Sequence, residues 1–216
     1  MSRNKLAFAS AAVAVAVAFA APANATITFT TQPGSDPYAG PTPTYDFDTS
    51  TPAFSGGNVV GPGTTSGQFA QPFGSTGQYY SVGPSTSTPG TIDLSSFGDI
   101  FNLSLIWGSV DTYNTLTFLD ASNNVLATFT GNQIFNPANG DQTSPNTNPL
   151  VTFFFDGTDV GNVASMQLSS TQNAFEIDDI AVNGVPEPAT WAMMLLGFGA
   201  VGVALRRGKT PLRQLA

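Results

Sequence analysis

Short apolar segments, alternating with polar residues and separated by turn formers, are the feature that most limits how this chain can fold. In residues 101–107 the side chains of Phe101, Leu103, Leu105 and Trp107 recur at every second position, which predicts a half-buried strand with these four on one face. Further apolar segments end at turn residues, at 115–118, 125–129, 150–155, 163–168 and 175–182. Before residue 185 no stretch has the period of an amphipathic helix. We therefore expect an all-β fold, an antiparallel β-sandwich of jelly-roll type.

Turn chemistry supports the same fold. Asp120-Ala121-Ser122-Asn123-Asn124 lies between two of these segments and predicts a hairpin, because Asn and Asp tolerate left-handed backbone geometry. Residues 32–90 contain 9 Pro and 11 Gly, but they also hold eight aromatic residues. Disordered segments are poor in aromatics, so we expect short strands joined by turns here.

Charge is distributed very unevenly along the chain. All six basic residues lie near the two ends: Arg3, Lys5, Arg206, Arg207, Lys209 and Arg213. Between residues 26 and 185 there is no Lys or Arg, whereas 13 of the 14 acidic residues fall there, so this part alone carries a charge of −13. Such a field repels phosphate backbones, which excludes nucleic acid as a partner and leaves cations and neutral glycans.

The N-terminus has the three parts of a secretory signal peptide. Arg3 and Lys5 are followed by an apolar run over 6–21, and Ala23 and Ala25 supply the small residues that signal peptidase needs before Thr26. We therefore expect a signal-peptide helix in residues 1–25 and a mature domain over 26–184.

The C-terminus carries a second apolar segment. Residues 189–205 contain no charge, and as a helix they would measure about 25 Å, the short end of what crosses a bilayer. Arg206 and Arg207 follow at once. Because basic residues stay on the cytoplasmic side, we expect one transmembrane helix over 189–205, a cytoplasmic tail over 208–216, and a domain outside the cytoplasm.

The same stretch, residues 185–207, resembles the PEP-CTERM sorting signal in its PEPxxWA variant. The residues that carry the resemblance are Pro186, Glu187, Pro188 and Trp191, followed by the apolar span and the stop pair Arg206 and Arg207. The nine residues after that pair are more than such signals usually have. The resemblance implies a substrate of exosortase that passes through an inner-membrane intermediate and then reaches the outer envelope surface or the extracellular matrix. It also implies an association with exopolysaccharide and biofilm.

Most catalytic chemistry is excluded by composition. The chain has no His and no Cys, and no Lys between residues 26 and 185, so Ser-His-Asp, Cys-His and Ser-Lys arrangements cannot form there. Zinc and copper sites on imidazole or thiolate are excluded for the same reason. Carboxylate chemistry remains, and Glu176, with Asp178 or Asp179 as its partner, is the only candidate pair for a glycoside hydrolase. We expect no enzyme, and we expect Glu176 and Asp178 to alternate outward on a solvated strand face.

We expect no cofactor, and calcium is the alternative left open, because it needs only oxygen ligands and clustered Asp residues supply them. The candidate ligands are Asp46, Asp48, Asp156, Asp159, Glu176 and Asp178. The first two are expected on one side of a strand and the next two around a glycine turn. No regular EF-hand loop is present, so these six are not assigned to a single site.

The expected function follows from these points: an exported, exosortase-processed structural protein of the cell surface or matrix. In a narrower version it binds a glycan, with aromatics such as Trp107, Tyr79 and Tyr80 stacking on sugar rings, although a place in the core is the more common explanation for most such aromatics. The alternatives are a carboxylate-dependent glycoside hydrolase and a calcium-dependent carbohydrate-binding module.

Overall fold

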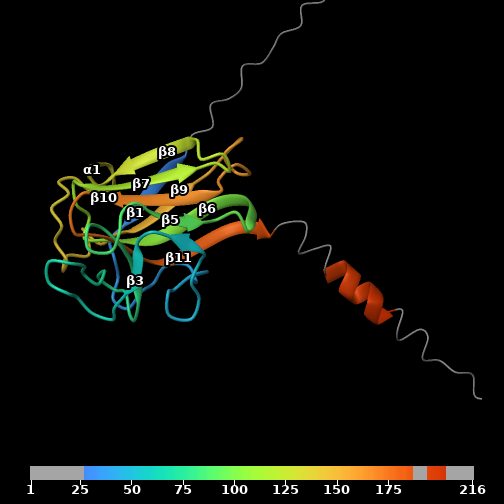
Figure 1. Ribbon diagram of the computed structural model, residues 1–216, viewed down its shortest axis with the longest axis horizontal. Helices are drawn as coiled ribbons and strands as arrows, with labels where there is room; N and C mark the ends of the chain where they lie inside the picture. Colours follow the sequence, from blue (N-terminus) through green and yellow to red (C-terminus); the bar gives the residue numbers. More distant parts are fainter. Residues whose placement is uncertain (1–26, 187–193, 203–216) are drawn as a thin grey trace, which may run out of the picture.

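The computed structural model describes residues 27–186 and 194–202. Residues 27–186 form two antiparallel sheets, with one short helix beside them (Figure 1). The elements are β1 (Thr28–Gln32), β2 (Phe54–Ser55), β3 (Asn58–Val60), β4 (Tyr79–Val82), β5 (Gly90–Asp93), β6 (Phe97–Gly108), β7 (Asn114–Leu119), β8 (Val125–Thr130), α1 (Gly131–Ile134), β9 (Leu150–Phe154), β10 (Ser165–Ser170) and β11 (Phe175–Pro186).

The sheet topology is that of a jelly roll. The larger sheet has the order β1-β9-β6-β11-β4-β3 and the smaller one β2-β5-β10-β7-β8. Within these, β4 pairs with β11, β5 with β10, β6 with β9 and β7 with β8, so the last eight strands form a nested hairpin that folds over into two layers. The predicted all-β sandwich is confirmed. The predicted signal-peptide helix lies outside the described residues.

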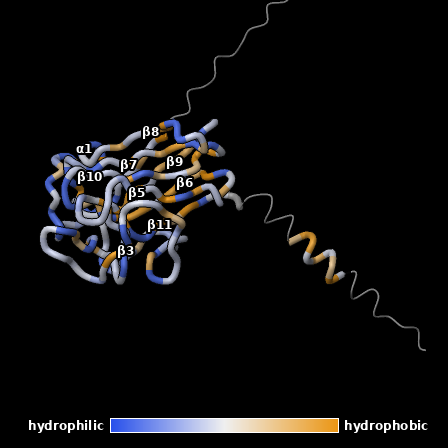
Figure 2. Tube along the Cα trace, viewed as in Figure 1, coloured by the Kyte–Doolittle hydropathy of each residue, from blue (hydrophilic) through white to orange (hydrophobic). Residues whose placement is uncertain are grey.

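The core fills the space between the two sheets with aromatic and aliphatic side chains. Trp107 of β6 stacks on Phe175 of β11 with ring centroids 4.3 Å apart, and Phe118 of β7 meets Phe153 of β9 edge to face at 5.0 Å. Hydrophobic residues concentrate on the strands and hydrophilic ones on the surrounding loops (Figure 2). Trp107, Tyr79 and Tyr80 are all fully buried, so the idea that these three stack on sugars is wrong.

One strand departs from its predicted alternation. Leu103, Leu105 and Trp107 face the core as expected, but Phe101 is 45% exposed, and Ile100 is buried in its place. The reason is a β-bulge: Asn183 pairs with Asn102, but Gly184 pairs with Ile100, so Phe101 is an extra residue on β6. A bulge shifts the alternation by one position, so Ile100 faces the core in place of Phe101. A second register shift, between Gly184 and Pro186, brings Phe97 back against the core.

The chain leaves the sandwich directly from a strand. β11 runs to Pro186, whose backbone pairs with Phe97 at the start of β6, so the first residue of Pro-Glu-Pro belongs to the larger sheet. Beyond it, residues 194–202 form an exposed helix. In the described part of the chain, no helix has both the length and the apolar character needed to cross a membrane. The rest of the predicted span, 189–193 and 203–205, lies outside the described residues.

Candidate functional site

Two carboxylates of β11 lie on the outer face of the larger sheet, and they are not solvated. Glu176 and Asp178 alternate with the core residues Phe175 and Ile177, as their spacing predicts, but each is only 1% exposed. The expectation of a solvated face is wrong because the Gly- and Pro-rich loop over residues 61–78, between β3 and β4, lies across these strands.

Both carboxylates bind that loop. Glu176 Oε1 accepts a hydrogen bond from the backbone N–H of Ala70 at 2.8 Å, and its Oε2 accepts one from the hydroxyl of Ser109 at 3.2 Å. Asp178 Oδ2 accepts a hydrogen bond from the hydroxyl of Ser75 at 2.5 Å. Asp178 Oδ1 accepts the N–H of Asp179 at 2.8 Å. The two acids therefore fasten the loop to the sheet at two points.

Burial makes both acids weak. Loss of hydration raises the pKa of Glu176 to about 7, although the hydrogen bonds from Ala70 and Ser109 oppose the shift. Burial likewise raises the pKa of Asp178 to about 8, and the neighbouring Asp179 adds to the increase. Near neutral pH these side chains are therefore partly or mostly protonated and can also donate hydrogen bonds.

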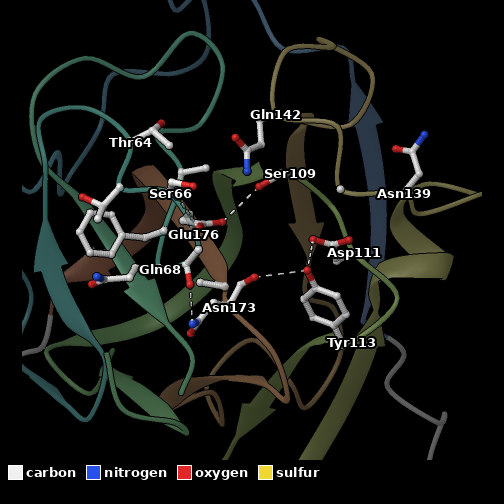
Figure 3. Close-up of a pocket in the computed structure, with 16 residues that line it drawn as sticks. Thr64, Ser66, Gln68, Ser109, Asp111, Tyr113, Asn139, Gln142, Asn173 and Glu176 are labelled. Carbon is white, nitrogen blue, oxygen red and sulfur yellow. Dashed lines mark hydrogen bonds between the residues drawn. The ribbon is translucent and has the colours of Figure 1, made fainter. Parts of the chain in front are cut away.

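A cleft of about 520 Å³ opens beside Glu176 at one end of the sandwich (Figure 3). It lies between the loop of residues 64–70 on one side and that of 139–142 on the other, with the end of β6 and the approach to β11 at its base. The polar side chains that line it are Thr64, Thr65, Ser66, Gln68, Ser109, Asp111, Tyr113, Asn139, Gln142, Asn173 and Glu176.

Hydrogen bonds hold one wall of the cleft in place. The hydroxyl of Tyr113 donates to Asp111 Oδ2 at 2.7 Å and also lies 3.4 Å from the carbonyl oxygen of Asn173 (Figure 3). Burial raises the pKa of Asp111, although the Tyr113 hydrogen bond opposes the shift. The side-chain amide of Asn173 donates to the carbonyl oxygen of Gly67 at 2.8 Å, which ties this wall to the opposite loop.

The chemistry of the lining selects a class of ligand. Hydroxyls and amides dominate, and the half-buried rings of Phe69 and Tyr113 add apolar surface. The chain has no Lys, Arg or His between residues 26 and 185, so no cationic side chain from this part can offset Glu176 and Asp111. An anionic ligand would be repelled, whereas a neutral molecule rich in hydroxyl groups would find donors and acceptors throughout.

The comparison with known protein families gives a match at the C-terminal end of the chain, outside the cleft. Residues 184–208 match the family model described as the PEP-CTERM protein-sorting motif. The chain carries a PEP-CTERM motif. It is therefore an exported protein that is targeted to exosortase and through it to the cell surface. Comparisons with curated proteins and with solved structures gave no match.

The PEP-CTERM match covers every residue that the sequence resemblance singled out: Pro186, Glu187, Pro188, Trp191, Arg206 and Arg207. Of these, only Pro186 lies among the described residues, as the end of β11. Ala23 and Ala25, the predicted signal-peptidase residues, lie outside them as well.

The acids proposed as calcium ligands do not come together as one site, although Asp46 and Asp48 lie near enough to Asp179 to add to the increase in its pKa that burial causes. Asp46 is not on a strand as expected; it begins a turn, where its side chain accepts hydrogen bonds from the backbone of Asp48, Thr49 and Ser50. Asp156 and Asp159 form a turn after β9, joined by a backbone hydrogen bond of 3.0 Å. Within residues 27–186 and 194–202, no three acidic side chains are arranged to share a metal ion.

The structure also changes which carboxyl group accompanies Glu176. Asp178 and Asp179, the partners considered from the sequence, are not part of the cleft, and Asp111 is the second carboxyl group that lines it. The sequence did not indicate three parts of the cleft: Asp111, Asn173 and the loop of residues 64–70. In the chain, Asp111 lies 65 residues before Glu176, Asn173 lies 3 residues before it, and the loop of residues 64–70 lies about 110 residues before it. No local sequence pattern links these positions to Glu176. Only the turn-forming Gly residues indicated that residues 61–78 form a long loop.

Proposed function

We propose that the jelly roll is a non-enzymatic module that binds a neutral saccharide, and that exosortase processing delivers it to the envelope surface or the extracellular matrix. The partner would be exopolysaccharide, as in a biofilm. One observation carries the proposal: a cleft of about 520 Å³ lined by hydroxyl and amide groups, with no cationic side chain available from residues 26–185.

The size and rigidity of the cleft support binding. Ligand sites in proteins commonly measure about 300–1,000 Å³, so this one has room for a short oligosaccharide. Asn173 and Tyr113 are already held by hydrogen bonds, so these side chains lose little further conformational entropy when a ligand binds.

The state of Glu176 favours binding over hydrolysis. Glycoside hydrolases need two carboxyl groups that reach the scissile bond from opposite sides. Glu176 is 1% exposed, and both of its oxygens are engaged by Ala70 and Ser109. A hydrolase remains the second candidate for one specific reason: Glu176 and Asp111 line the same cleft, and burial raises the pKa of both.

Calorimetric titration of residues 26–186 with neutral gluco-oligosaccharides tests the proposal, with an oligosaccharide of uronic acids as the charged comparison. We expect the neutral series to bind and the uronic series not to bind. Gln142→Ala should weaken binding about two- to twelvefold, the effect of losing one hydrogen bond of about 0.5–1.5 kcal/mol. The control Asn162→Ala, an exposed amide outside this cleft, should leave the affinity unchanged.

The same samples separate the two candidates. Release of reducing ends from the oligosaccharides, abolished in Glu176→Gln, would establish the hydrolase and reject the binding module. Absence of binding by every neutral saccharide tried, with the fold intact by circular dichroism, would remove support for both.

A further inference from the structure

The edges of the two sheets are protected unequally. A strand at a sheet edge presents unpaired N–H and C=O groups, and proteins blunt such edges with short strands, bulges, charges or proline. The four edge strands here are β1 and β3 in the larger sheet and β2 and β8 in the smaller one. Three of them are blunted. β3 has three residues and β2 has two, whereas β8 carries a bulge at Leu126, where Phe118 pairs with Ala127 and Leu119 with Val125.

β1 has none of these protections. Its five residues pair with β9 in unbroken register, from Thr28 opposite Phe154 to Gln32 opposite Leu150, so the edge is straight. The strand contains no proline, glycine or charged residue, and all of its residues except Phe29 are exposed. Among the described residues, β9 is the only strand that pairs with β1, so the outer row of backbone groups is unpaired.

The strand is nonetheless held firmly to the domain. Phe29 points inward and meets Phe129 of β8 edge to face, with ring centroids 5.4 Å apart. An edge that is both anchored and straight is a ready template for another strand. The exposed residues Thr28, Thr30 and Thr31 have the β-branched side chains that favour extended pairing.

The distribution of charge leaves this edge open to a second copy of the chain. Two copies of a domain with a charge of −13 repel each other over most of their surfaces, but residues 26–35 and 142–155, which include β1 and its neighbour β9, contain no charged residue. We infer that this edge is a homodimer interface, in which β1 pairs antiparallel with β1 of a second copy and joins the two larger sheets into one. A register centred on Thr30 pairs all five residues about a two-fold axis, the commonest symmetry of homo-oligomers. This inference is independent of the saccharide cleft.

The chain contains no cysteine, which allows a direct test. In the full chain on intact cells, Thr30→Cys places two thiols opposite each other, so a short bismaleimide should yield a cross-linked dimer. The matched control is Thr158→Cys, an exposed threonine in the turn after β9, which should react with a maleimide but give no dimer.

A second measurement uses residues 26–186, which contain the complete core. Sedimentation equilibrium should give twice the monomer mass, and higher sodium chloride should strengthen the dimer because salt screens the repulsion between copies. Thr30→Glu should shift the mass to that of a monomer, whereas Thr158→Glu should not. The inference is overturned if Thr30→Cys gives no more dimer than Thr158→Cys, or if the folded domain stays monomeric at high salt.

Discussion

Glu176 and Asp178 make the stability of the domain depend on pH in an unusual direction. Their pKa values are about 7 and about 8 in the folded protein, above the usual values of 4.5 and 3.8. At a pH between the usual and the raised value of each group, the native state therefore binds more protons than the unfolded state. The stabilisation that these two groups contribute is therefore fully present below about pH 4 and is lost as the pH rises through 7 and 8. We expect the free energy of unfolding of residues 26–186, measured by urea denaturation, to fall between pH 5 and pH 9. The decrease from Glu176 alone should be about 3 kcal/mol.

A neutral variant at either position should remove that acid's share of the pH dependence. Glu176→Gln and Asp178→Asn keep the size of the side chain and its ability to accept from Ala70 or Ser75, so each should flatten the pH profile and raise stability at pH 9. Thr158→Ala, at an exposed position without a titratable group, should leave the slope unchanged. Equal slopes in all three variants would mean that the buried acids do not cause the effect.

The sequence alone predicts the direction of these side chains but not their surroundings. Alternation with Phe175 and Ile177 places Glu176 and Asp178 on the outer face, and they do lie there. Their burial depends on Ala70 and Ser75, which are 106 and 103 residues away in the chain. No pattern within one strand carries information about a loop that distant.

At the scale of a strand, the bulge in β6 makes a sharp prediction about two neighbouring apolar residues. Phe101 is exposed because it is the extra residue, whereas Leu103 is fully buried in the core. Leu103→Ala should therefore lower the free energy of unfolding by about 2–5 kcal/mol. Phe101→Ser should change it by about 0.5 kcal/mol or less, as is usual for surface substitutions.

Urea denaturation at pH 5 measures both variants against the unsubstituted domain. If Phe101→Ser costs as much as Leu103→Ala, then Phe101 faces the core and β6 is unbulged, as simple alternation predicts.

Other strands follow their local sequence closely. The hairpin of β7 and β8 forms around residues 120–124 as predicted, and Asn123 adopts the left-handed backbone conformation with a φ of 62°. The bulge in β6 was not predictable in the same way, because it is set by the register with β11, some 80 residues later. Turn chemistry is local, whereas register is a property of two strands.

At the scale of the whole molecule, the sorting signal and the charge distribution together predict a distinctive product. If exosortase removes the tail near Pro186-Glu187-Pro188 and signal peptidase cuts before Thr26, the product contains no Lys or Arg. Trypsin cuts only after those residues, so it should not cut this product even in denaturant. We expect mass spectrometry of the native envelope or medium to find such a species.

Replacing Pro186-Glu187-Pro188 by three alanines should make a longer, trypsin-sensitive form accumulate. The matched variant replaces the exposed Thr158, which lies outside the motif, by alanine and should be processed normally. Recovery of wild-type protein outside the cell with Arg206 and Arg207 still attached would contradict exosortase processing.

The place of β11 in the larger sheet has a consequence for the order of events during biogenesis. β11 lies between β6 and β4, yet it is the last strand of the jelly roll in the chain and is followed at once by the PEP-CTERM motif. The chain is made and exported from its N-terminus, so until β11 emerges from the membrane β4 and β3 have no connection to the rest of their sheet. Closing contacts between strands so far apart in sequence is also intrinsically slow. The domain can therefore finish folding only once its sorting signal is about to emerge, which links maturation of the fold to arrival of the signal that routes it.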